Sequence, residues 1–143
     1  MESKKEVTQH NKEICKRFFD ELQNKKNLDI IDELVEKNVI SHDPFPGQAP
    51  GSAGLRTTMQ IFHKAFPDLS VKINDMIAED DKVMTKLTVT GSHQNLFMEI
   101  APTGNKINYE EVIILRLKND KITEHRAVAD ALSLMQQLGA IHQ

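Results

Sequence analysis

The spacing of apolar residues changes at Pro67, and this change constrains the fold more than any other feature of the sequence. Before Pro67, apolar residues recur every three or four positions, which is typical of helices that bury one face. After it, apolar and polar residues alternate, which is typical of strands that bury one face. The order predicts an α+β fold in which helices pack on the concave face of a cone-shaped, curved antiparallel sheet and leave room for a ligand.

Three helices are predicted before Pro67, over residues 6–25, 27–38 and 53–66. The second and third are separated by a loop, because three prolines and three glycines fall between Pro44 and Gly54. Ser52 is expected to cap the third helix, and Pro67 is expected to help end it.

Four long strands are predicted after Pro67, over residues 69–80, 82–93, 106–120 and 121–129. The sequences EDDK and KNDK between them predict two hairpin turns. Asp130 stands directly before a helical pattern that ends at Gly139, so it is interpreted as the cap of a last helix rather than as a catalytic group.

Composition and charge exclude several classes of protein. A chain of 143 residues with 39% hydrophobic and 27% charged residues is typical of one globular domain, predicted over residues 1–143. The net charge is -3 and the basic residues are scattered, so neither a nucleic acid nor a membrane is expected as a partner. The single cysteine, Cys15, is interpreted as a buried thiol, and an N-terminus without the apolar core of a signal peptide indicates a cytoplasmic protein.

Four stretches together carry a resemblance to a known family: HDPFPG, AFPDL, GSHQNLFMEIAPTGNKI and DKITEHRAVADALSLMQQLGAI. In order and spacing they resemble the SnoaL-like polyketide cyclases, within the nuclear transport factor 2-like superfamily. The resemblance runs from about residue 7 to residue 141. It implies a cystatin-like α+β cone and a homodimer. It also implies ring closure by intramolecular aldol condensation with neither cofactor nor metal.

The family's catalytic positions are only partly kept in this sequence. Its HR pair matches His125 and Arg126, but the acid/base aspartate that follows this pair is replaced by Ala127. The supporting glutamine falls on Glu111, and the supporting histidine falls on Ile113. Aldol cyclisation by the family's route is therefore not expected.

Glu111 and His125 are the predicted catalytic residues. Glu111 shares its strand face with apolar residues, so its carboxylate is expected to face the cone with a raised pKa, as suits a general base. His125 is expected to lie beside it on the neighbouring strand and to complete an acid/base pair. The alternatives are that Glu111 pairs with Arg126 or Lys86, and that His125 is a structural histidine.

Six further residues are predicted to contact the ligand. Alternation allows only one of His42 and Asp43 to face the cavity, and Asp43 could instead form a turn at the start of the loop. His93 is expected at the rim or in a solvated turn. The remaining contacts are expected from the apolar stripe of the third helix, Met59, Phe62 and Phe66.

These observations predict a cofactor-free protein that binds a small, mostly apolar carbonyl compound and performs acid/base chemistry of the cyclase, isomerase, dehydratase or hydrolase type. No metal is expected, because the six histidines show no close ligand pair. The alternatives are a binding module without catalysis and a dimeric interaction module. A two-fold dimer is expected through the outer face of the sheet, which carries Lys86, Thr88 and Thr90.

Overall fold

The computed structural model describes residues 2–141 of the chain. Its first helix, α1 (Lys4–Phe19), begins at Ser3, whose side chain accepts a hydrogen bond from the Glu6 backbone N–H. The helix continues as one π-helical segment, η1 (Asp20–Asn24), so the predicted stripe over residues 6–25 is one continuous rod. This rod buries Cys15, Phe18, Phe19 and Leu22.

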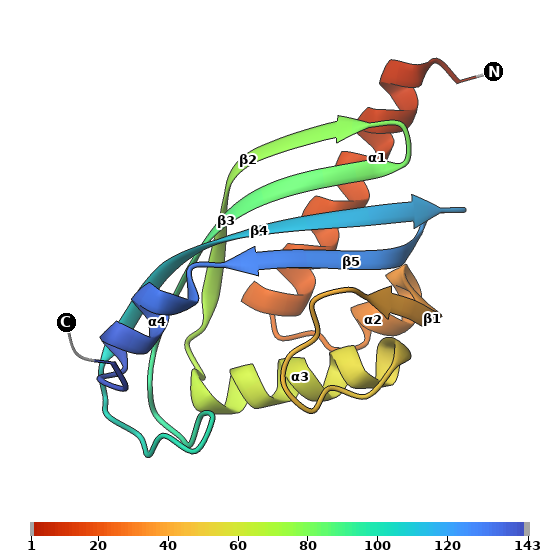
Figure 1. Ribbon diagram of the computed structural model, residues 1–143. Coiled ribbons are helices and arrows are strands. Elements are labelled where there is room, and N and C mark those ends of the chain that lie inside the picture. Colours follow the sequence, from red (N-terminus) through yellow and green to blue (C-terminus); the bar gives the residue numbers. More distant parts are fainter. Residues whose placement is uncertain (1, 142–143) are drawn as a thin grey trace.

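Five strands form one mixed sheet in the order β1-β5-β4-β3-β2 (Figure 1). The four predicted strands are β2 (Ser70–Glu79), β3 (Lys82–Ser92), β4 (Lys106–Lys118) and β5 (Lys121–Ala129). They pair antiparallel, and both predicted hairpin turns are confirmed. β1 (Val35–Ser41) adds a parallel edge beside β5.

The strand β1 corrects the predicted second helix. That helix, α2, spans only Ile30–Leu34, and the chain passes directly into β1 at Val35. The helical spacing of apolar residues continues for one more step, but Val35 pairs with Ile122 and is buried at the sheet. Tertiary pairing therefore overrides a short helical pattern.

The expected cap at Ser52 is also wrong. Helix α3 (Gly51–Ala65) begins two residues earlier than predicted, with Pro50 at the cap position and no side-chain cap bond. Gly51 has a φ of +76° and lies so close to β1 that a Cβ would come within 2.5 Å of the Lys37 carbonyl oxygen. Only glycine fits this approach, so the loop and not a serine cap sets the start of the helix.

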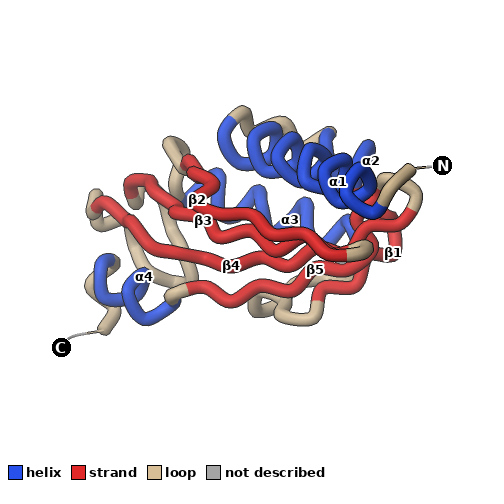
Figure 2. The backbone as a smooth tube through the Cα atoms, turned by 90° about the horizontal axis from the view of Figure 1, so that it is seen from above, coloured by secondary structure: helices blue, strands red, loops and turns tan. Residues whose placement is uncertain are grey.

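The helices α1, α2 and α3 lie on one side of the sheet, as Figure 2 shows, and α4 (Ala131–Gln137) lies at the end where β5 finishes. The inward faces of the strands are buried, including Val83, Thr85, Leu87 and Val89 of β3. Asp130 caps α4 as predicted, since its side chain accepts from the Ser133 N–H at 3.1 Å. These observations confirm the α+β fold with helices on the concave face.

Candidate active site

A cavity of about 410 Å³ lies between the concave face of the sheet and the helices. Its walls are mostly apolar, and polar groups enter from β4, β5, η1 and the loop after β1. Three phenylalanines close one side, with ring centroids 5.3 Å apart for Phe45 and Phe62 and 5.1 Å apart for Phe62 and Phe97. The size and the apolar walls suit a small organic ligand.

Glu111 lies on this wall without a partner. Its side chain lines the cavity and makes no hydrogen bond or ion pair with the described residues. Lys86, one expected partner, instead pairs with Glu110 at 2.8 Å, and Arg126 is exposed at the surface. Because burial disfavours the charged form, the pKa of Glu111 is raised from 4.5 to about 7.

His125 lines the same cavity but does not lie beside Glu111. In the β4–β5 register, Glu111 is opposite Ala129 and His125 is opposite Leu115. The two residues are thus four positions apart along the strands, or about 13 Å. The expected adjacent pair is therefore wrong, although both side chains reach the cavity. Burial lowers the pKa of His125, and the nearby charge of Asp43 opposes this shift.

Asp43 is held in the cavity wall by the backbone of β5. Its Oδ2 accepts a hydrogen bond from the Ala127 N–H at 3.0 Å, so a carboxylate lies beside Ala127 at the cavity wall. His42 points the other way and pairs with Glu124, Nε2 to Oε1, at 2.8 Å. The expectation that only one of the two faces the cavity is met, and that one is Asp43.

The loop after β1 is fixed by Gln48, which explains why Asp43 is held in place. Gln48 Oε1 accepts hydrogen bonds from the Phe45 backbone N–H and the Thr58 hydroxyl. Its Nε2 donates to the Ser41 hydroxyl at 3.2 Å. One side chain therefore ties the proline-rich loop to α3 and to the end of β1.

Besides His42, two more predicted ligand contacts lie outside the cavity lining. Phe66 is fully buried in the core against Phe97, at 5.1 Å between ring centroids. His93 is also fully buried, with Nδ1 hydrogen-bonded to the Thr103 hydroxyl at 3.0 Å. His93 is therefore neither at the rim nor in a solvated turn. Met59 and Phe62 do line the cavity.

Tyr109 and Gln23 also line the cavity and were missed in the sequence. Tyr109 precedes Glu111 by two positions, so strand alternation alone places both on one face. Gln23 is in η1, and its Nε2 donates to the sulfur of Met59 while its Oε1 is enclosed without a partner. No sequence signal marks Gln23, because its position depends on how the helix meets the sheet.

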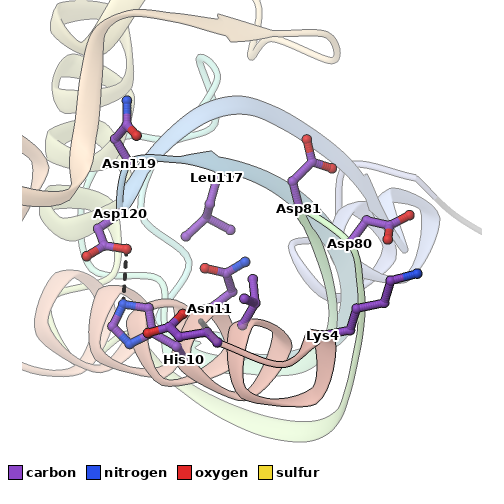
Figure 3. Close-up of a pocket in the computed structure, with 10 residues that line it drawn as sticks. Lys4, His10, Asn11, Asp80, Asp81, Leu117, Asn119 and Asp120 are labelled. Carbon is purple, nitrogen blue, oxygen red and sulfur yellow. Dashed lines mark hydrogen bonds and ion pairs between the residues drawn. The ribbon is translucent and has the colours of Figure 1, made fainter.

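A second hollow of about 360 Å³ lies at the start of α1 and differs in character (Figure 3). It is bordered by the two hairpin turns, and most of its lining residues are polar, with Asp80, Asp81 and Asp120 among them. His10 bonds to Asp120 across it at 3.0 Å. In residues 2–141, no three His, Cys, Asp or Glu side chains are grouped so that they could hold a metal ion.

The sequence profile of the SnoaL-like polyketide cyclases matches residues 13–138. The chain belongs to this family. A proposed polyketide cyclase from Bacillus cereus ATCC 10987 is 32% identical over 99% of this chain and 87% of its own, with a TM-score of 0.82. AclR, a proposed hydroxylase from Streptomyces galilaeus, is 29% identical over 95% and 89% of the two chains, with a TM-score of 0.84.

Likeness within the SnoaL-like family extends to more distant structures. A proposed SnoaL-like polyketide cyclase from Jannaschia sp. CCS1 is 21% identical, covers 99% of this chain and all of its own, and has a TM-score of 0.85, which shows the shared fold. No curated protein matches the chain. Among the helices of residues 2–141, none is long and apolar enough to cross a membrane.

Proposed function

We propose that this SnoaL-like protein binds a small, mostly apolar carbonyl compound in the 410 Å³ cavity and removes a proton from the carbon next to the carbonyl. One observation carries the proposal: Glu111 presents an unpartnered carboxylate on an apolar wall, and its pKa is raised to about 7. A base with a pKa near neutrality is effective at accepting a proton from carbon. The reaction is then an isomerisation, a dehydration or a cyclisation that begins with this transfer, whereas in a hydrolysis Glu111 would instead accept a proton from the attacking water.

His125 and Asp43 form the second polar end of the cavity. His125 lies about 13 Å from Glu111 along the strands, and Ala127, whose N–H bonds to Asp43, lies about 7 Å from it, so the imidazole serves a different part of the ligand. We expect the imidazole to exchange a proton with a ligand oxygen at that end, while Asp43 favours the protonated ring. The two ends suit a fused-ring or extended ligand with oxygen functions at both ends, as in polyketide-like compounds.

The test is hydrogen–deuterium exchange at the α-carbon of 2-tetralone in D₂O, followed by proton NMR. Exchange reports proton removal whatever the complete reaction is. Glu111→Gln should lower the protein-dependent exchange rate by roughly 10²- to 10⁴-fold, the usual contribution of a general base. Glu110→Gln is the matched control, because Glu110 directly precedes Glu111, pairs with Lys86 and lies on the outer face. Equal exchange by the native protein and Glu111→Gln would disprove the base.

The family resemblance implies that Ala127 stands in place of an acid/base aspartate, and this favours a second candidate, which is ligand binding without catalysis. Tyr109 gives a direct readout, because it lines the cavity and is the only tyrosine in a chain without tryptophan. Saturable quenching of its fluorescence by 2-tetralone, with no exchange above the buffer rate, would favour this candidate. Quenching together with exchange that depends on Glu111 would exclude it.

A further inference from the structure

Tyr109 presents a hydroxyl group that the fold does not use. The residue is only 6% exposed, and its hydroxyl makes no hydrogen bond within residues 2–141. Four side-chain atoms of these residues are fully enclosed without a partner: Gln23 Oε1, His63 Nε2, Thr85 Oγ1 and His93 Nε2. The Tyr109 oxygen is not among them, so it borders open space, and the hollow that Tyr109 lines is the main cavity.

Tyr109 and Glu111 are neighbours on the cavity face of β4. They are two positions apart, which places their Cα atoms about 7 Å from each other. The pKa of the Tyr109 hydroxyl is raised by burial and by the nearby charge of Glu111. The group therefore stays protonated at neutral pH and acts as a hydrogen-bond donor.

We propose that Tyr109 donates a hydrogen bond to the ligand's carbonyl oxygen and stabilises the negative charge that forms there when Glu111 removes the neighbouring proton. The inference rests on the proposed function of Glu111. In the step, the proton moves to the Glu111 carboxylate and the C–H electron pair forms a C–C double bond. The carbonyl π pair moves to the oxygen, which accepts the hydrogen bond from Tyr109. Glu111 then returns the proton to carbon, so no co-reactant is needed.

The spacing decides between Tyr109 and His125 as the donor. A carbonyl oxygen lies within a few ångströms of the α-proton, so its donor must be close to the base. Tyr109 is two positions from Glu111, whereas His125 is about 13 Å away along the strands. The ligand's reacting end is therefore an enolisable ketone at Tyr109 and Glu111, with the rest of an apolar body towards Ala127 and His125.

The proposal is tested by equilibrium binding of two matched probes at pH about 6. One is 3,4-dinitrophenol, whose phenolate resembles an enolate, and the other is 1,2-dinitrobenzene, which lacks the oxygen. A hydrogen bond to a charged group contributes about 1.5–3 kcal/mol, so Tyr109→Phe should weaken phenolate binding by about tenfold or more. Its effect on dinitrobenzene should be below about twofold, because the ring that packs in the wall is retained.

Equal changes for the two probes, or no saturable binding of either to the native protein, would overturn the assignment. Tyr109→Phe removes no hydrogen bond of the fold, so its melting temperature should match that of the native protein. Glu111→Gln should bind the phenolate at least as tightly, because it carries no negative charge. Glu111→Gln could keep full exchange of 2-tetralone while Tyr109→Phe still loses phenolate binding. That result would disprove Glu111 as the base and would still support Tyr109 as the hydrogen-bond donor.

Discussion

The two faces of β4 place the same side chain in opposite surroundings. Glu110 points to the outer face, where it pairs with Lys86 at 2.8 Å and is about half exposed. Glu111 points to the cavity, where it has no partner and its pKa rises to about 7. Residue type and sequence neighbourhood are nearly identical, so strand parity alone separates a solvated charge from a candidate base.

The unpartnered position of Glu111 has a cost in stability. An unpartnered carboxylate on an apolar wall lowers stability whenever it is charged, and an apolar residue there would remove that cost. Within residues 2–141, the charged side chains on the outer face, such as Lys86 and Glu110, reach solvent or each other. A site that lowers stability and is nevertheless built into the wall is typical of function.

The largest predicted effect on stability is at Glu111. Its pKa is raised on folding from 4.5 to about 7, so the folded state holds the proton more firmly than the unfolded state. The stability linked to the protonated group is fully present below pH 4.5 and is lost as pH rises through about 7. Glu111→Gln should therefore unfold like the native protein at pH about 4 and be more stable by about 3 kcal/mol at pH about 8. Urea unfolding at both pH values measures this.

Glu110→Gln is the control for this experiment, because its side chain is half exposed and paired with Lys86, and this substitution should not make the protein more stable at pH about 8. The ion-pair alternative for Glu111 makes the opposite prediction, because loss of a partner would leave a buried cation uncompensated. A Glu111→Gln variant that is less stable than the native protein at pH about 8 would contradict the assignment of an unpartnered base.

The sequence patterns predicted most of the fold because the spacing of apolar residues reflects which side chains are buried. Alternation identified the four long strands and both hairpins, and the cap at Asp130 followed from its place before a helical stripe. The strand β1 was missed because its seven residues follow a helical turn without a break, and only its pairing with β5 shows that it is a strand. Such pairing involves residues about 85 positions apart and leaves no local pattern.

Only the part of the site that depends on the alternation of side chains along a strand was predicted from the sequence. Parity correctly placed Glu111 and His125 on the cavity side, but it does not give the register between β4 and β5, which separates them by four positions. The contacts of Asp43 with Ala127 and of Gln48 with Thr58 depend on the path of a loop. Such a path follows from packing, and no spacing in the sequence encodes it.

The second prediction concerns the outer face as a whole, where we propose that a two-fold dimer forms. Besides Lys86 and Thr90, this face exposes Ile77, Met84 and Val128, and Met84 is paired with Ile77 on one side and Ile114 on the other. An exposed apolar patch bounded by polar residues is typical of an interface. Met84→Glu should raise the dimer dissociation constant by at least about tenfold, or about 1.4 kcal/mol.

Sedimentation equilibrium measures the dissociation constant directly. The matched control is Glu36→Gln, which changes an exposed residue of β1 at the far edge of the sheet and should leave the constant unchanged. A native protein that remains monomeric at micromolar concentration would contradict the dimer. An unchanged constant in Met84→Glu would place the interface elsewhere.

The smallest predicted effect on stability comes from breaking the Lys86–Glu110 ion pair. Both side chains are about half exposed, so their attraction is screened by water and salt, and such pairs contribute about 0.2–1 kcal/mol. In the monomer, Glu110→Gln should therefore lower stability by less than about 1 kcal/mol, and added salt should reduce the difference further.

If the outer face is buried in a dimer, water no longer screens the pair, and the same substitution lowers stability by more than it does in the monomer. Measuring Glu110→Gln in the Met84→Glu background separates the two cases: a cost that falls to the monomer value there shows that the interface covers the pair. A cost that is large in both backgrounds would mean that the outer face of β4 is not solvated even in the monomer, which would remove the contrast with Glu111.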